Sequence, residues 1–560
     1  VLDASSKTIG DNDEINNIKK ILGLQSGKDY LDVSDLRYGR IMVMTDQDVD
    51  GSHIKGLVFN MVNVLWPSLL KVDNFMTSML TPIVKASKKS DVVSFYTLTD
   101  YEEWKTENDS GKGWNIKYYK GLGTSSTKEA KDYFKELKIV NYQMNEKSKD
   151  SLDLAFNKKR ADDRKEWLHA FDRSVVLDSS EANVSYDAFI NDDLRHFSNY
   201  DTERSIPNIC DGQKTSQRKI LFAAFKRNLK KEIRVAQLAG YVSEHAAYHH
   251  GEASLQGAII GLAQNFVGSN NINTLEPIGQ FGTRLQGGKD AASPRYIHTH
   301  LSNISQLLFN KDDFPIYEYI EDDGLQVEPL HYAPILPLIL INGCNGIGTG
   351  FSSTIPCFNP KDIMQNLRNL INNNPIDDMM PWYMGFDGTI TKINEHSYLT
   401  KGTYNILDKN TVEITELPIG KWTDSYKEYL ESIIIDGSSK KKSDEPKKKI
   451  PKTYIKNYEN HCTESKVRFL LKFDQTILKN LIENTKDDDE YANELEKVLK
   501  LTSKKSTSNM YLFNEKGTIT KYDTINNILT EFYKIRLNYY DKRKEYQLNE
   551  LNKQLVVLDA

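Results

Sequence analysis

The sequence predicts a multidomain protein that combines α/β and α+β parts. Its 560 residues are enough for about three to five domains. Apolar strands alternate with amphipathic helices over residues 1 to about 140, and alternating strands return from about residue 326 after a helix-rich middle. Hydrophobic residues make up 39% and charged residues 27% of the chain, which is the balance of a globular protein.

Composition excludes two classes of protein. No stretch approaches the ~18 consecutive apolar residues of a membrane span, so we expect no membrane partner. The four cysteines lie far apart and form no CxxC pair. We therefore expect a reducing intracellular compartment, without a disulfide scaffold or a structural zinc site.

The N-terminal part begins with α/β signals. Residues 41–44 (IMVM) predict a short buried strand. Ser125 or Thr127 is expected to cap a helix that runs through residues 129–137. The charged residues 141–185 are expected to form a mostly helical connector.

Three carboxylates follow the predicted strand at alternate positions: Asp46, Asp48 and Asp50. Such hard oxygen ligands suit Mg²⁺. An EF-hand loop has the same opening, but its twelfth position would be Leu57 instead of glutamate, so we reject it. A polar turn that holds no ion remains an alternative, because unpaired carboxylates at this spacing repel one another.

The charge distribution indicates a polyanionic partner. The whole chain carries a formal charge of -5, yet residues 204–234 hold nine basic residues against two acidic ones, a local charge of +7. A local basic surface is typical of a phosphate-binding groove. Charge alone leaves a solvated helix face equally open.

The C-terminal half predicts strands and one long helix. Val412 and Ile414 alternate with polar residues, as do Val467, Phe469 and Leu471. The lysine-rich residues 436–452 are expected to be a disordered loop. The last forty residues predict a coiled-coil or helix-pair seam formed by Ile528, Phe532, Ile535, Tyr539, Tyr546, Leu548, Leu551, Leu555 and Leu558.

Several long motifs resemble one family. Residues 37–57 (RYGRIMVMTDQDVDGSHIKGL) and 118–134 (YYKGLGTSSTKEAKDYF) are similar to the TOPRIM domain of the eukaryotic type IIA DNA topoisomerases. Further motifs that resemble the winged-helix and tower parts of these enzymes lie at residues 204–227, 248–259, 266–297 and 340–356. The resemblance runs in order along the whole chain.

The resemblance implies a domain order. A TOPRIM metal-binding domain with a parallel sheet is expected at 1–150, followed by a helical connector, a winged-helix domain, an α/β tower and the start of a coiled-coil arm. Their expected bounds after the first domain are 151–185, 186–325, 326–520 and 521–560.

The resemblance also implies an activity. The chain would be the DNA-cleavage and religation core of an ATP-dependent type II topoisomerase. Such an enzyme makes a transient double-strand break through 5′-phosphotyrosyl links with Mg²⁺, and a second duplex passes through it. A TOPRIM nuclease and a non-catalytic DNA-bending scaffold are the alternatives.

The family's reaction assigns roles to seven positions of this chain. Tyr296 would be the nucleophile, and Arg295 would stabilise the charge that develops on phosphorus. The implied metal ligands are Asp46 and Asp48, with Asp50 in support, for two Mg²⁺ ions per active site. His249 and His250 would lie near the scissile phosphate.

Other positions match DNA contacts of the family, and Arg218 joins them from the basic segment. Ile347, between two glycines, would insert between base pairs, although without the resemblance it would be placed in the core. The expected DNA contacts are Lys120, Arg164, Lys165, Arg204, Lys214, Arg218, Tyr248, Ser254 and Trp422.

Partners and location also follow from the resemblance. We expect a homodimer that binds double-stranded DNA in the nucleus. ATP would be bound by a module of the full-length enzyme and not by this chain. The family's TOPRIM glutamate would precede Val1, so this 560-residue chain is expected to bind and bend DNA but to cleave it poorly.

Overall fold

The computed structural model describes residues 1–119, 121–178, 182–322, 324–434, 453–483 and 490–559. Lys120 and the lysine-rich residues 436–452 therefore lie outside the described residues. The chain forms two compact units. The first comprises Val1–Thr202 with Gly348–Phe351, and the second comprises Glu203–Ile347 with Ser352–Ala560. No helix in the described ranges has the length and apolar character needed to cross a membrane.

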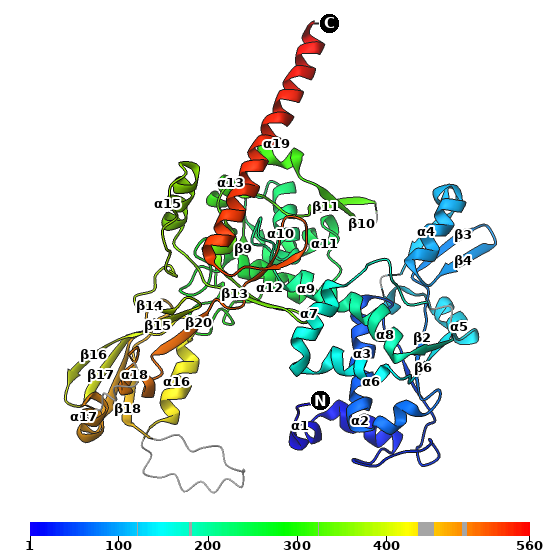
Figure 1. The fold of residues 1–560 in the computed structure, drawn as a ribbon, viewed down its shortest axis with the longest axis horizontal. Coiled ribbons are helices and arrows are strands. Elements are labelled where there is room, and N and C mark those ends of the chain that lie inside the picture. The colour runs from blue at the N-terminus through cyan, green and yellow to red at the C-terminus, as the bar shows by residue number, and fades with distance from the viewer. Residues whose placement is uncertain (120, 179–181, 323, 435–452, 484–489, 560) are drawn as a thin grey trace. The chain divides into compact units, whose positions relative to one another are not determined.

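The first unit is a mixed α/β structure (Figure 1, blue to cyan). Its helices and strands are α1 (Ser6–Gly10), α2 (Asp13–Leu22), β1 (Ile41–Val43), α3 (Val49–Leu65), β2 (Met76–Met79), β3 (Val84–Lys88), β4 (Asp91–Phe95), α4 (Leu98–Glu107), β5 (Asn115–Tyr118), α5 (Thr127–Lys135), β6 (Ile139–Gln143), α6 (Ser148–Phe156), α7 (Ala161–His169), β7 (Asn183–Ser185), α8 (Tyr186–Phe189) and α9 (Arg195–Ser205).

The main sheet of this unit has the strand order β1-β2-β6-β7. β1 is parallel to β2 and β6 is parallel to β7, but β2 and β6 are antiparallel. The prediction of a parallel sheet is therefore wrong. β1, α3 and β2 form one crossover, after which the chain builds a separate antiparallel sheet, β4-β3-β5, and returns as β6 in the opposite direction.

Local predictions in this unit are confirmed only in part. Residues 41–43 form the expected strand, but it is half-buried rather than buried. The helix expected after residue 125 is α5, and its cap is Ser126, one residue from either predicted cap. Residues 186–202, expected in the winged-helix domain, lie in the first unit. There the centre of the Phe189 ring lies 5.0 Å from that of Phe59.

The second unit holds the remaining elements. They are α10 (Thr215–Lys226), β8 (Ile233–Arg234), α11 (Val235–His245), α12 (Glu252–Ala263), β9 (His298–Thr299), α13 (Asn303–Leu308), β10 (Tyr319–Asp322), β11 (Leu325–Pro329), α14 (Leu338–Asn342), β12 (Cys344–Ile347), β13 (Ser352–Ile355), α15 (Pro360–Ile371), β14 (Thr389–Asn394), β15 (Ser397–Lys401), β16 (Thr403–Asp408), β17 (Thr411–Glu416), α16 (Thr423–Ser432), β18 (Ile455–Asn460), β19 (Phe469–Phe473), α17 (Gln475–Glu483), α18 (Glu494–Val498), β20 (Thr502–Ser506), β21 (Tyr511–Phe513), β22 (Ile519–Lys521) and α19 (Ile525–Asp559).

Two cores organise this unit. The larger core gathers the apolar faces of α10, α11 and α12 with the start of α19. The smaller core lies between α16 and the antiparallel sheet β16-β17-β19-β18. Val412 and Ile414 lie in β17, and Phe469 and Leu471 lie in β19, all fully buried. The two predicted strands are therefore present, although the second begins at Phe469 and leaves out Val467.

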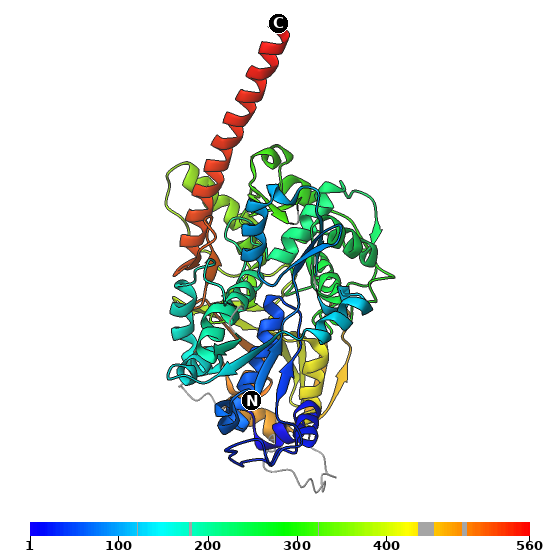
Figure 2. The same cartoon turned by 90° about the vertical axis from the view of Figure 1, so that its right-hand side faces the viewer.

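The long helix predicted at the C-terminus is α19 (Figures 1 and 2, red). Ile528, Phe532, Ile535 and Tyr539 are buried against other elements of the second unit, whereas the seam from Leu548 onward is exposed. Figure 2 shows the C-terminal half of α19 standing clear of that unit's other elements.

A buried contact helps to dock α19. His331 is almost fully buried, and its Nε2 lies 2.9 Å from the hydroxyl of Tyr539. Burial lowers the pKa of His331 to about 4. The imidazole is therefore neutral at physiological pH.

Candidate active site

A turn in the second unit presents Arg295 and Tyr296. The carbonyl oxygens of Pro294 and Ile297 accept hydrogen bonds from the N–H groups of Ala236 (3.1 Å) and Val235 (3.0 Å), the first two residues of α11. Such N–H groups have no partner within their own helix. The turn is therefore fixed to the N-terminus of α11.

The Tyr296 side chain points away from this anchor. It is 72% exposed, while the next side chain, Ile297, is buried. Arg295 is also exposed. Directly after the turn, β9 pairs with β8, so that His298 lies opposite Arg234. A rigid backbone thus carries a phenol and a guanidinium group that a large substrate can reach.

Glycines shape the loop that leads to the turn. Gly282 has a φ of 95°, and a Cβ there would come within 2.5 Å of the Gly288 carbonyl oxygen. A Cβ at Gly287 would come within 2.4 Å of the Trp422 indole. Trp422 is half-buried and packs on this loop, so its DNA contact stays a prediction beside a clear packing role. The buried pair of Arg284 and Glu416 ties the same loop to β17.

The two histidines and the Tyr296 turn lie near opposite ends of α11. Residues 248–251 link the C-terminal end of α11 to α12, whereas the Tyr296 turn binds the other end of α11. The 11 residues of α11 separate these ends by about 16 Å.

The linker instead forms its own cluster. His249 Nε2 lies 3.2 Å from Asp322 Oδ2, and the His250 ring packs edge-on against Tyr248. Partial burial raises the pKa of Tyr248, and the nearby Arg204 charge opposes that shift. The structure thus brings together predicted DNA contacts from α9 and from this linker. Ser254, another predicted contact, is exposed in the first turn of α12.

The acidic residues of the first unit are divided among different contacts. Asp46 Oδ1 accepts the Leu122 N–H at 2.6 Å, and Asp48 caps α3 by accepting the Gly51 N–H at 2.7 Å. Asp50 lies inside the first turn of α3. Within the described ranges, no three His, Cys, Asp or Glu side chains are grouped so as to hold a metal ion. The structure thus does not gather the three predicted ligands.

Asp46 and Asp48 still offer the donor groups that Mg²⁺ takes. Both side chains are exposed, and each has a carboxylate oxygen beyond the one that accepts the hydrogen bond above. Mg²⁺ keeps several waters and needs only one or two protein carboxylates beside substrate phosphates. Glycine backbones surround Asp46: a Cβ at Gly51 would come within 1.9 Å of its carbonyl oxygen, and one at Gly121 within 3.0 Å of Oδ2.

Arg218 corrects a predicted DNA contact. Its Nε and Nη2 donate to the carboxylate of Asp211 at 2.7 Å and 3.1 Å, and the two residues are only 7% and 0% exposed. Asp211 Oδ2 also accepts the Tyr332 N–H at 2.9 Å. The guanidinium is therefore part of the interior, and the prediction that Arg218 binds DNA is wrong.

The other predicted cations have mixed surroundings. Lys214 Nζ donates to the Asn345 carbonyl at 3.3 Å, and burial lowers its pKa. Arg164 donates to the carbonyls of Leu154 (2.9 Å) and Asn157 (2.6 Å), and Lys165 pairs with Asp162 at 2.8 Å. These three residues remain predicted DNA contacts.

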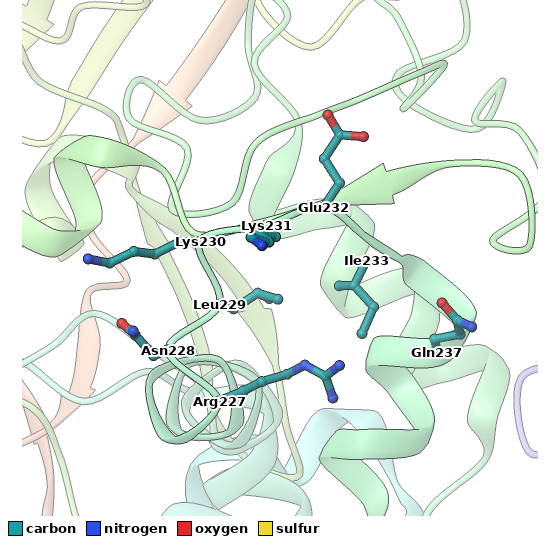
Figure 3. A pocket seen from close by; sticks show the side chains of 8 residues that line it. All are labelled: Arg227, Asn228, Leu229, Lys230, Lys231, Glu232, Ile233 and Gln237. Atoms are coloured by element: carbon teal, nitrogen blue, oxygen red, sulfur yellow. The ribbon is translucent and has the colours of Figure 1, made fainter.

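A cationic loop leads into β8, the strand that pairs with β9. Its cations belong to the basic segment 204–234 but are not among the individually predicted DNA contacts. Residues 227–233 border an open cavity of about 740 Å³ together with Gln237 of α11 (Figure 3). Arg227, Lys230 and Lys231 line it. The Leu229 carbonyl accepts the Leu301 N–H at 3.0 Å, which ties the loop to the segment that follows β9.

Ile347 is an exposed apolar residue. It ends β12, which pairs with β13 as a hairpin, and it is 78% exposed. The preceding Gly346 is buried, and a Cβ there would come within 2.2 Å of the Ser205 carbonyl oxygen. A rigid hairpin thus holds an isoleucine in solvent, and the alternative placement of Ile347 in the core is wrong.

Two family models match the chain. The model described as DNA gyrase/topoisomerase IV matches residues 204–560. The model described as the C-terminal associated domain of TOPRIM matches residues 79–202.

Curated relatives match nearly the whole chain. DNA topoisomerase 2 of Plasmodium falciparum is 47% identical over 99% of this chain and 38% of that protein. DNA topoisomerase 2 of Arabidopsis thaliana is 45% identical over 100% of this chain and 37% of that protein. DNA topoisomerase 2-beta of Homo sapiens is 45% identical over 98% of this chain and 34% of that protein. The chain thus spans little more than a third of each relative.

A solved structure gives the same result. The crystal structure of the Plasmodium falciparum topoisomerase II DNA-binding, cleavage and re-ligation domain has a TM-score of 0.78 and 47% identity, and the match covers 99% of this chain and 73% of that one. Taken with the family model that matches more than half of its residues, this likeness shows that the chain belongs to the type IIA DNA topoisomerases.

Proposed function

We propose that this chain is the DNA-cleavage and religation core of a type II DNA topoisomerase. The observation that carries the proposal is the exposed Tyr296 beside Arg295 on a turn fixed to α11. Phenols are mostly packed or hydrogen-bonded in folded proteins. A rigidly held, solvent-facing tyrosine is suited to meet a phosphodiester at the surface of a duplex.

The proposed chemistry is a reversible exchange of phosphate esters. The Tyr296 oxygen attacks phosphorus and forms a phosphotyrosine bond to the 5′ end, while the bond from phosphorus to the 3′ oxygen breaks. The phenolic proton is lost, and the 3′ oxygen leaves as a hydroxyl after protonation. Arg295 offsets the negative charge on the phosphoryl oxygens. Attack by the 3′ hydroxyl on the phosphotyrosine restores the strand and the tyrosine.

The acidic residues would hold the positive charge that faces the phosphate. Asp46 and Asp48 would hold Mg²⁺, with Asp50 in support. Two such ions per active site, when bound, would polarise the scissile phosphate and stabilise the leaving oxygen. The Leu122 N–H orients Asp46, and the helix cap orients Asp48.

Assembly of the site requires two copies in this proposal. As the family resemblance implies, Tyr296 of one copy would meet Asp46 and Asp48 of the other copy. The exposed leucine seam of α19 gives a surface on which two copies can pair. We further propose that the protein acts on double-stranded DNA in the nucleus, and that ATP is used by a module outside this chain.

The winged-helix and tower assignments belong to this proposal. Of the expected residues 186–325, those of the second unit, 203–325, would hold the winged helix with Tyr296. Residues 326–520 would form the tower that carries Trp422. Residues 1–150, 151–185 and 521–560 would be the TOPRIM domain, its connector and the start of the coiled-coil arm.

One experiment separates the proposal from its alternatives. Supercoiled DNA is incubated with the full natural protein and Mg²⁺, then denatured, and DNA covalently bound to protein is counted. A topoisomerase core gives an adduct that reverses when Mg²⁺ is chelated before denaturation. A TOPRIM nuclease gives cut DNA with no adduct, and a bending scaffold gives neither.

The exposed Ile347 predicts an effect on DNA bending. Ile347→Ala should reduce DNA bending, measured by energy transfer between dyes at the ends of a duplex, because an apolar side chain that separates base pairs is lost. The protein should still bind the duplex, since phosphate contacts are unchanged. Leu325→Ala, which changes an exposed residue of β11, is the control. Unchanged bending in the Ile347 variant would show that the residue does not insert.

The cationic loop predicts a change in salt dependence. Replacing both Lys230 and Lys231 with Met should lower the slope of log K against log[salt] by about 2, roughly 0.9 for each lost phosphate contact. Lys361→Met and Lys409→Met, which change exposed residues elsewhere in the second unit, form the control. A slope equal to the wild-type value would remove this loop from the DNA-binding surface.

A further inference from the structure

A second group of side chains in the first unit lies beyond the acidic site. The Glu129 carboxylate accepts hydrogen bonds from the Tyr119 hydroxyl, from Lys117 Nζ at 2.9 Å, and from the backbone N–H (2.7 Å) and hydroxyl (2.9 Å) of Ser126. Lys85 Nζ on β3 lies 4.0 Å from the same carboxylate. One half-buried carboxylate thus joins β3, β5 and the start of α5.

These contacts lie on both sides of Leu122. Tyr119 follows β5 and precedes Leu122, while Ser126 comes after it and caps α5. Leu122 in turn donates its N–H to Asp46 Oδ1 at 2.6 Å. The position of that N–H therefore depends on a segment whose two flanks are held by the same carboxylate.

Helix capping alone does not explain the cluster. A capping box needs only the cap residue and the glutamate three positions later, which here are Ser126 and Glu129. The contacts from Tyr119 and Lys117 lie outside this motif and add an aromatic and a cationic partner. Both residues lie at or directly after β5, on the N-terminal side of Leu122.

The carboxylate stays charged at any working pH. Burial alone would raise the pKa of Glu129, but the hydrogen bonds from Tyr119, Ser126 and Lys117 lower it from 4.5 to about 2. Its stabilising contribution is therefore fully present above pH 4.5 and is lost only as the pH falls toward 2.

We propose that Glu129 is a positioning residue for Asp46. It fixes the segment on both sides of Leu122, so that the Leu122 N–H occupies one oxygen of Asp46 and leaves the other for a divalent cation. This inference rests on the proposed function only in assigning the cation to Asp46. Groups that orient a metal ligand typically change metal affinity by about 10–100-fold when they are removed.

The test is Glu129→Gln, which keeps the side chain's size and removes its charge. We expect amide hydrogen exchange at Leu122, followed by mass spectrometry, to become at least about tenfold faster. The Mg²⁺ concentration for half-maximal adduct formation in the full natural protein should rise about 10–100-fold. The adduct yield at saturating Mg²⁺ should change little, because Glu129 does not touch the substrate.

The matched control is Asp132→Asn on the same helix. Asp132 is exposed and pairs with Lys135 at 3.8 Å, so its loss should alter neither readout. Glu129→Gln behaving like Asp132→Asn in both measurements would overturn the proposal. Should Glu129→Gln fail to fold, Tyr119→Phe keeps the helix cap and is expected to shift both readouts in the same direction by a smaller amount. No shift in folded Tyr119→Phe would then overturn it.

The two readouts separate the inference from the function. Faster exchange at Leu122 in a protein whose wild type forms no adduct would support the positioning role and refute the proposed cleavage. Normal exchange together with a normal adduct in Glu129→Gln would refute the positioning role alone.

Discussion

Tyr296→Phe is expected to abolish covalent attachment of the protein to DNA while leaving DNA affinity nearly unchanged. The substitution removes only the nucleophilic oxygen and keeps the ring. Since the turn is held by backbone bonds from Pro294 and Ile297 to α11, its shape should not depend on the hydroxyl. Adduct is measured after denaturation in Mg²⁺, and affinity by fluorescence anisotropy with a labelled duplex.

A second exposed tyrosine provides the control. Tyr38, in the first unit, is 58% exposed, and Tyr38→Phe should leave both adduct and affinity unchanged. An adduct that persists in Tyr296→Phe would place the nucleophile on another residue. Loss of DNA binding together with the adduct would mean that the hydroxyl serves binding rather than chemistry.

Asp211→Ala is expected to destabilise the protein by about 3–5 kcal/mol, because it leaves a buried guanidinium without its partner. Asp211 accepts two hydrogen bonds from Arg218 and one from the Tyr332 N–H. The loss is measured as the shift in the urea midpoint of the unfolding transition of the second unit. Asp424→Ala, on a partly exposed residue at the start of α16, should shift the midpoint far less.

Substitutions of Arg218 and Asp211 can show that Arg218 acts in the interior and not at the DNA-binding surface. Arg218→Met should reduce stability but leave the salt slope of DNA binding unchanged, in contrast to the change of Lys230 and Lys231. A flattened slope with normal stability would restore Arg218 to the DNA surface. The double change of Asp211 and Arg218 should cost less than the two single changes together, because no unpaired charge remains.

Periodicity predicted the elements that bury one face. Val412 and Ile414 in β17 alternate with polar neighbours, and the spacing of Ile528, Phe532 and Ile535 matches one face of α19. The direction of β6 could not be predicted in this way. Alternation shows which face of a strand is buried, but the sign of its pairing depends on the path of the intervening chain.

Residue type did not reveal which charges lie inside. Arg218 and Lys230 contribute equally to the basic segment, yet Arg218 is buried with Asp211 and Lys230 lines an open cavity. The helix face that each occupies, and the presence of an acid across from it, decide the difference. Family resemblance likewise assigned roles to His249 and Tyr296 without showing that their backbone segments lie near opposite ends of α11.

The sequence also could not decide whether Ile347 is buried or exposed. Its apolar side chain and glycine neighbours fit a buried strand as well as a wedge. Only the hairpin, with buried Gly346 against Ser205 and Ile347 in solvent, distinguishes the two.

The buried His331 makes the attachment of α19 sensitive to acid. Its folded pKa of about 4 lies below the ordinary 6.5, so the unfolded chain binds the additional proton between these values. Burial and the charges of Arg218 and Lys542 oppose protonation, whereas Asp211 favours it. The contribution of the His331–Tyr539 contact is therefore complete above pH 6.5 and declines as the pH falls toward 4. In a mildly acidic medium the base of the long helix would loosen before the Glu129 carboxylate of the first unit takes up a proton.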